Sequence, residues 1–401
     1  MVSFEVRRLP KVPAIALLLA AIPTAGLGQL QFRGDEVLAR LTDSIEETRQ
    51  REGVHSAELI GPMTALALYY QEMNDPELAI AALQQARQIV RVNYGLFSLE
   101  EAPLLRAWIR AELERGNHQG AWDVEQRLLN LVRRNLDDAR VVPILREIGD
   151  RRLDILERYT QGEYPPEIVL GCYYAARESG DCHAGSRGRA KAALLGEALA
   201  YYTSAVDTLL RTEGYSSDEL PEMLMYIARV SYEHGRQRLG RNSLRYMLAY
   251  NIENSAPAFA QAKALVQIAD WDLQFARDRM RANSALEVYR QAYARLEDAG
   301  VEQASIDSLF SPDVPVVLPA FLPNPLVSKE RPGTTGYIDV AFDITKYGES
   351  DDVEIVAAEN ASKQAQGRLV ELIKGSRFRP IMTAGRVEES TRVTLRYHVS
   401  D

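Results

Sequence analysis

An internal repeat constrains the fold of this chain more than any other feature of its sequence. The segment that begins at Ala79 aligns with the segment that begins at Ala121, and the match ends at Asn93 and Asn135, so the offset is 42 residues throughout. From about residue 35 to 310, apolar residues recur at three- and four-residue intervals, which is typical of amphipathic helices. A constant offset over such segments predicts stacked helix pairs. An irregular helical bundle with chance similarity is the alternative interpretation.

The helix pairs resemble tetratricopeptide repeats, although they are spaced more widely than the usual unit. The positions that carry the resemblance are Leu66, Ala67, Tyr70, Ala79, Leu83 and Ala86. In this resemblance, small residues let two helices approach closely, and the larger ones fill the gap beside them. An Ala-x3-aromatic-x2-Ala spacing recurs later at Ala198, Tyr202 and Ala205 and at Ala285, Tyr289 and Ala292. The resemblance implies a body, from residue 29 to 310, with a surface that holds peptides or partner domains.

The last 68 residues, Thr334 to Asp401, follow a different pattern. Residues 336–344 largely alternate between apolar and polar side chains, as a half-buried strand does, and 353–356 is a second strand candidate. Residues 362–374 fit a helix with one apolar face. The chain then closes on an alternating segment at 391–399. This order predicts a small α+β domain at 334–401, so the fold class is a helical-repeat body followed by that domain.

A basic turn, Ser376-Arg377-Phe378-Arg379-Pro380, separates the helix from the last strand, and Gly385-Arg386-Val387 follows it. Together with the strand Gly336-x-Ile-x-Val-x-Phe342, this order resembles the C-terminal domain of TonB-family proteins. The family usually carries Trp two residues before the Phe of the turn, where this chain has Ser376. The resemblance covers about a sixth of the chain. It implies binding rather than catalysis, because such a domain has no nucleophile, metal box or phosphate loop.

The resemblance also implies where a partner binds. A sheet with an open edge recruits extended peptides by strand addition, and the implied edge is the strand Arg392–Val399. The candidate partner-binding residues are Arg377, Arg379, Arg392, Thr394 and Arg396. Arg377 and Arg379 could donate charge-assisted hydrogen bonds to carboxylates of a partner. The alternative for these two is internal packing of their stems with solvated heads.

Residues 311–333 contain six prolines, a density that excludes helix and favours extended chain. We expect a semi-rigid spacer between the helical body and the C-terminal domain. The alternative is that this segment is itself a ligand for a proline-binding domain.

The N-terminus has the pattern of an export signal. Arg7, Arg8 and Lys11 precede a wholly apolar run at 14–22, and small residues lead to an expected cleavage site after Gly28. The alternative is an uncleaved inner-membrane anchor, but a membrane-spanning helix needs about 20 apolar residues. We therefore expect a mature chain outside the cytoplasm, and the TonB resemblance makes that compartment the periplasm of a Gram-negative bacterium. The net charge of −9 argues against nonspecific binding of nucleic acid.

The chain has two cysteines, Cys172 and Cys182. In an exported protein two cysteines at this spacing predict a disulfide, which would hold an insertion between helices. A metal site formed by the two cysteines and His183 is a more specific alternative, but the sequence nearby offers no fourth ligand. Two buried free thiols are the remaining alternative.

No motif for catalysis occurs in the sequence. It lacks the nucleophile elbow, the phosphate loop and the dinucleotide fingerprint, and its five histidines form no His-x-x-x-His pair. We therefore expect no enzyme activity and no cofactor. The sequence favours an adaptor that binds protein partners, such as the periplasmic segment of an outer-membrane protein. The alternative is a TonB-type energy transducer that couples the inner-membrane proton gradient to outer-membrane transport, which would require the run at 14–22 to remain as an anchor.

Overall fold

The computed structural model describes residues 27–163, 187–327 and 336–399. These residues belong to two compact units, which divide between Leu131 and Val132. The apolar run of the predicted export signal lies outside the described residues, and so does the predicted pair Cys172 and Cys182 with its neighbour His183. The two units are described separately.

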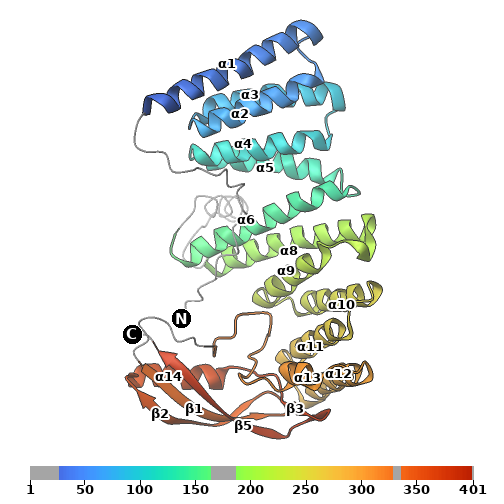
Figure 1. Cartoon of the computed structure of the whole chain (residues 1–401), viewed down its shortest axis with the longest axis vertical. Coiled ribbons are helices and arrows are strands. Elements are labelled where there is room, and N and C mark those ends of the chain that lie inside the picture. The colour runs from blue at the N-terminus through green and yellow to red at the C-terminus, as the bar shows by residue number, and fades with distance from the viewer. Residues whose placement is uncertain (1–26, 164–186, 328–335, 400–401) are drawn as a thin grey trace. The chain divides into compact units, whose positions relative to one another are not determined.

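The first unit is built from helices. They are α1 (Leu27–Glu52), α2 (Ile60–Glu72), α3 (Pro76–Tyr94), α4 (Ala102–Glu114) and α5 (His118–Arg133), whose last two residues pass the unit boundary. Short 3-10 turns at Ala57–Leu59 and Leu99–Glu101 lead into α2 and α4. Helices α2 and α3 form a hairpin, and α3 packs against α4 in turn (Figure 1).

The repeat positions form the contact between α2 and α3. Ala67 on α2 and Ala79, Leu83 and Ala86 on α3 are fully buried. The small side chains let the two helices approach closely, and Asp75 begins α3 by accepting a hydrogen bond from the N–H of Leu78. The helix-pair prediction is therefore confirmed here.

A shared capping arrangement begins three of the helix pairs, and the repeat alignment did not reveal it. The side chains of Ser56, Ser98 and Asp138 each accept a hydrogen bond from the backbone N–H two residues on, at 3.2, 3.3 and 2.9 Å. At the other end of a pair, Asn93 Nδ2 donates to the carbonyl oxygen of His55 at 2.7 Å. This hydrogen bond joins the end of α3 to the loop before α2, the first helix of the same pair. Asn93, which ends the repeat match, therefore has a structural role.

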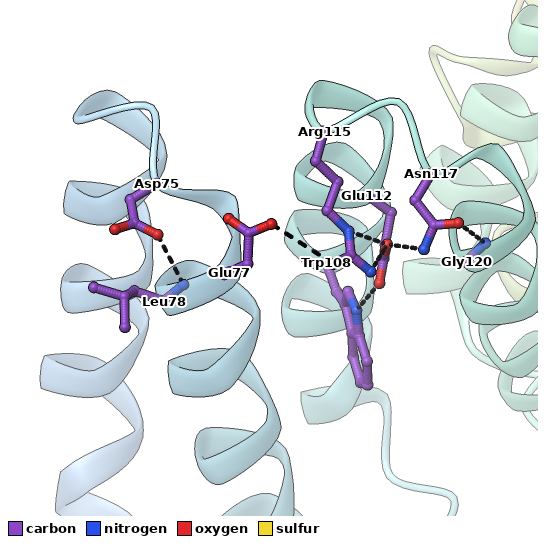
Figure 2. Close-up of polar contacts among 8 residues, drawn as sticks. All are labelled: Asp75, Glu77, Leu78, Trp108, Glu112, Arg115, Asn117 and Gly120. Carbon is purple, nitrogen blue, oxygen red and sulfur yellow. Dashed lines mark hydrogen bonds and ion pairs between the residues drawn. The ribbon is translucent and has the colours of Figure 1, made fainter.

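A buried carboxylate closes the turn between α4 and α5. Glu112 is only 4% exposed, and it accepts hydrogen bonds from Trp108 Nε1 at 2.9 Å, Arg115 Nε at 2.7 Å and Asn117 Nδ2 at 2.7 Å (Figure 2). The N–H of Gly120 donates to Asn117 Oδ1 at 3.2 Å, and any Cβ at Gly120 would collide with both side chains. Side chains of α4 and of the turn, together with a backbone N–H of α5, therefore fix this turn.

The second unit begins with further helix pairs. Its helices are α6 (Val142–Thr160), α8 (Arg187–Thr212), α9 (Leu220–Glu233), α10 (Gln237–Glu253), α11 (Ala258–Gln274), α12 (Arg279–Asp298) and the short α13 (Gln303–Phe310). Helices α6 and α8, α9 and α10, and α11 and α12 pack as pairs (Figure 1). The later residues with the Ala-x3-aromatic-x2-Ala spacing are all fully buried: Ala198, Tyr202, Ala205, Ala285, Tyr289 and Ala292.

The C-terminal part of the second unit is a small α+β module. Its elements are β1 (Gly336–Thr345), β2 (Ser350–Glu359), α14 (Lys363–Gly375), β3 (Met382–Thr383), β4 (Arg386–Val387) and β5 (Ser390–Val399). The three long strands form an antiparallel sheet in the order β2-β1-β5, while β3 and β4 form a separate hairpin. Ser362 precedes α14 and caps it by accepting a hydrogen bond from the N–H of Ala365, and the helix buries Leu369 and Ile373 in the core of the sheet. The expected order of strand, strand, helix and strand is confirmed.

The proline-rich segment differs from the expected spacer. The N–H of Leu318 donates to the carbonyl oxygen of Arg377 at 2.7 Å, and the N–H of Arg379 donates to that of Val316 at 2.9 Å. Leu318 and Leu326 are buried. The expectation of a spacer is therefore wrong for residues 311–327, because the apolar residues between the prolines pack and the backbone pairs with the basic turn. The helices from Val132 onward and the C-terminal module form one compact unit.

Candidate protein-interaction site

Strand β5 lies at one edge of the three-stranded sheet. Its register with β1 is unbroken, from Ser390 opposite Thr345 to Val399 opposite Gly336. Among the described residues no strand pairs with its other side. Since backbone groups alternate in direction along an antiparallel strand, about half of the N–H and C=O groups of β5 face away from β1. The module therefore presents a regular row of backbone donors and acceptors.

The opposite edge, β2, is less regular. Its register with β1 shifts between Asp339 and Val340 and again between Ala341 and Asp343. Asp352 in β2 has a φ of +47°, in the left-handed region that non-glycine residues rarely adopt. Such irregularities disrupt the hydrogen-bond ladder between strands and disfavour the addition of another strand at that edge. Of the two edges, β5 is the one suited to accept another strand.

Arg396 is held on the surface of the sheet. It lies opposite Asp339, to whose carboxylate it donates two hydrogen bonds of 2.8 Å, and its guanidinium lies 4.0 Å from the centroid of the Tyr337 ring. The hydrogen bonds from Arg396 hold the pKa of Asp339 below its usual range. The charge of Arg396 is therefore matched within the module.

Arg392 has a similar environment four residues away along β5. Its guanidinium donates to Asp352 Oδ2 at 2.9 Å and also to Glu354, and it lies 3.7 Å from Asp343. Thr394 is exposed between the two arginines. A partner at this edge would therefore meet a hydroxyl and two arginines already paired with carboxylates, so backbone pairing would contribute most of the new contacts.

Arg379, which was expected in the partner-binding turn, lies inside the protein. It is 7% exposed and donates to the two carboxylate oxygens of Asp270 at 2.9 and 2.6 Å and to the carbonyl oxygen of Leu309 at 2.9 Å. The hydroxyl of Tyr289 donates to the same carboxylate at 2.6 Å. This arrangement of Asp270, Tyr289, Leu309 and Arg379 is called the docking network below.

Arg379 keeps its positive charge within the docking network. Burial alone would lower the pKa of Arg379, but the Asp270 carboxylate outweighs that effect and holds the pKa above its ordinary value. Burial also raises the pKa of Tyr289 well above its ordinary value, so the phenol stays protonated and can donate. A buried guanidinium with a two-point contact to a carboxylate is a strong and directional pair. The network therefore fixes the basic turn against α11, α12 and α13.

Arg377 makes a second connection between the basic turn and the helices of the second unit. Its Nη1 donates to the carbonyl oxygen of Ala276 at 3.2 Å, and its Nε donates to that of Tyr347 at 3.1 Å. The structure of the basic turn thus differs from both sequence-based predictions, which were contact with a partner and stems packed inside with solvated heads. Arg379 does not face a partner and its head is not solvated, because groups of the same chain satisfy it.

Sequence reasoning missed Asp270 and Tyr289 as members of this network. Asp270 and Arg379 are 109 residues apart, and no local pattern links them. One signal was available in Asp270-Trp271-Asp272, whose carboxylates point to different sides of the helix. Asp270 bonds to Arg379, and Asp272 instead accepts from Arg241 at 2.6 Å. A carboxylate on the apolar side of a predicted helix indicates a buried cationic partner.

The described residues contain no group of three or more His, Cys, Asp or Glu side chains that could hold a metal ion. Within the same ranges, no helix combines the length and the apolarity that a membrane span requires.

Helix pairs followed by an open-edged α+β module define the class of this protein: a helical-repeat protein with a small C-terminal sheet domain. No family model matches the chain. No curated protein matches it.

Solved helical-repeat structures resemble parts of the chain. BtubC from P. vanneervenii is 13% identical, with a TM-score of 0.35, over 75% of this chain and 97% of that one. A kinesin light chain with nearly identical TPR-like repeats from Podosopora anserina is 12% identical, with a TM-score of 0.33, over 60% of this chain and 98% of that one. Part of a TPR repeat-containing protein from Cytophaga hutchinsonii is 13% identical, with a TM-score of 0.23, over 69% and 98% of the two chains. At TM-scores this low, the fold assignment rests on the helix packing described above.

Proposed function

We propose that this chain is an adaptor that binds protein partners through the β5 edge of its C-terminal module. The observation that carries the proposal is the unbroken register of β1 with β5, beside an outer edge that no described strand occupies. An extended segment of a partner would add to this edge as a further strand, with main-chain hydrogen bonds for affinity. The docking network holds the module at a fixed place on the helices of its own unit.

The resemblance to the TonB C-terminal domain supports an envelope location for this adaptor. In that proposal the chain is exported, residues 1–28 are removed, and the partner is an envelope protein with an extended periplasmic segment. The helix pairs hold a second partner, as stacked repeats commonly do. The binding is noncovalent and needs no cofactor.

A photo-crosslinking amino acid at Thr394 tests the β5 edge. Thr394 is exposed near the middle of β5, and Val356 is a matched control because it is 60% exposed on the irregular strand β2. In cells that produce the full chain, we expect a discrete crosslinked partner from position 394 and none from position 356. Equal crosslinking from the two positions, or none from 394, would contradict strand addition at β5.

N-terminal sequencing of the protein from cell fractions tests the proposed location. A mature chain that starts near Gln29 in the soluble periplasmic fraction supports the exported adaptor. An intact N-terminus in the inner-membrane fraction would instead favour the anchored energy transducer. A full-length chain in the cytoplasm would contradict both.

A further inference from the structure

A cavity of about 770 Å³ opens on the helical part of the second unit, apart in sequence from the β5 edge. One wall is the face of α8 that carries Leu199, Ala200 and Thr203. The turn between α9 and α10 forms another wall, and Arg277, from the turn between α11 and α12, completes the lining. Three consecutive helix pairs therefore contribute to this cavity, which the repeat packing creates.

The part of the lining that belongs to described residues contains arginines and no carboxylate. Arg236, Arg238 and Arg277 line the cavity and are exposed. Within the described residues these three arginines make no ion pair of 4.0 Å or less. Arginines nearby behave differently: Arg241, for example, is paired with Asp272 at 2.6 Å. Three unmatched guanidinium groups in a chain with a net charge of −9 indicate a local binding surface for anions.

Other features of the lining strengthen this interpretation. His234 also lines the cavity, and its pKa is lowered mainly by burial and additionally by the charge of Arg236. Helix α10 begins here with Arg236 as its N-cap and without a side-chain cap, so the N–H groups of its first turn add to the same field. Leu239 is half-buried and adds apolar surface to the lining.

A second hollow of about 450 Å³ continues the surface along α10. It is lined by Arg241 and Arg245, which follow Arg238 at the three- and four-residue spacing of one helix face. Farther along the same helix, Leu248 and Ile252 line it, and Ile252 is 47% exposed. The surface thus changes from basic to apolar along α10.

We propose that this basic and apolar surface on α8, α10 and the adjacent turns binds an acidic segment of a partner protein. Its carboxylates would take charge-assisted hydrogen bonds from Arg236, Arg238 and Arg277. Its apolar side chains would pack on the leucines of the two hollows. A nucleic acid fits less well, because the apolar lining would find no match on a phosphate backbone and the net negative charge of the chain would repel a long polyanion.

The proposal extends the adaptor function by naming the chemistry of a second partner, and it does not depend on the β5 edge. The test uses the full chain and a fluorescein-labelled peptide in which Glu alternates with Leu, measured by fluorescence anisotropy. The variant Arg236→Glu/Arg238→Glu reverses two cations of the lining. The matched control, Arg110→Glu/Arg229→Glu, makes the same charge change at two exposed arginines of α4 and α9 outside both hollows. Circular dichroism checks that both variants are folded.

We expect the peptide to bind the wild-type chain and the control variant alike, and to bind the lining variant at least about tenfold more weakly. Binding should weaken as salt is added. A peptide with Gln in place of Glu should bind poorly. The proposal is overturned if the wild type fails to bind the acidic peptide, if the Gln peptide binds equally well, or if the lining variant keeps its affinity. Stronger binding of a single-stranded oligonucleotide at the same arginines would also overturn it. None of these results depends on crosslinking at Thr394, so the two proposals can fail separately.

Discussion

At the residue scale, the buried carboxylates of Glu101, Glu112 and Asp270 organise this protein, and each of the three accepts from two or more side chains. Glu101 is 2% exposed and lies between Arg87 and Arg91, with Arg91 Nε at 3.1 Å. Asp270 is also 2% exposed and accepts from Arg379 and Tyr289. Because a buried charge without partners is very costly, these contacts specify which helices and turns pack together.

Arg379→Met should destabilise the second unit by about 3–5 kcal/mol, because it leaves the Asp270 carboxylate buried without its cation. Arg396→Met removes an exposed, solvent-screened pair and should change the stability far less than Arg379→Met. Chemical denaturation followed by circular dichroism measures both. Adding Asp270→Asn to Arg379→Met should recover part of the loss. Equal costs for the two single variants would contradict a structural role for the docking network.

At the element scale, the turn between β1 and β2 fastens the sheet to the basic turn. Gly348 has a φ of +73°, its N–H donates to the carbonyl oxygen of Thr345 at 2.8 Å, and its own carbonyl oxygen accepts from the N–H of Phe378 at 2.8 Å. A Cβ at this position would collide with the carbonyl oxygen of Phe378. The close backbone approach and the left-handed conformation both require glycine here.

Gly348→Ala should therefore destabilise the module by at least about 1–2 kcal/mol, the cost of the left-handed conformation alone, with the collision added. Gly367→Ala is the matched control, because Gly367 lies within α14 and nothing approaches the position of its Cβ. That change should stabilise the helix by about 0.5–1 kcal/mol. Denaturation midpoints of the two variants should move in opposite directions, and a neutral Gly348→Ala would contradict this account of the turn.

At the scale of the whole molecule, the C-terminal module is part of the second unit rather than a domain on a spacer. Met382 from β3 and Leu318 from the proline-rich segment belong to the same buried cluster as Tyr289, Tyr293 and Phe310 of the helices. Residues 316–318 also pair with the basic turn, as described above. This shared core should make the module and the adjacent helices unfold together.

A chain that ends at Phe310 tests this shared core. Its loss of residues 311–401 would expose Tyr293 and Phe310 and leave Asp270 without Arg379. We expect a lower thermal midpoint for the remaining helices and stronger binding of a hydrophobic dye than in the full chain. A truncated chain that unfolds at the midpoint of the full-length helices would show that the module is an independent domain.

The sequence alone determined the elements and the faces that they bury. Three- and four-residue periodicity, the 42-residue offset and the alternation at 336–344 and 391–399 each report local backbone geometry, which short stretches of chain encode. The helix at 362–374 and the alanines at the helix contacts followed from the same local rules. The open β5 edge could be expected only through a resemblance to a known domain.

Only the tertiary structure decided which charges meet. A guanidinium such as that of Arg379 looks the same in a sequence whether it faces solvent, a partner or Asp270, because the contact is made by chain closure over 109 residues. For the same reason, the sequence of the proline-rich segment predicted a spacer, and only the tertiary structure showed that Leu318 and Leu326 are buried in a core. Arg277 lies about 40 residues after Arg236 and Arg238, and it joins them in the cavity lining only because the helix pairs stack, so no local sequence pattern predicted this group.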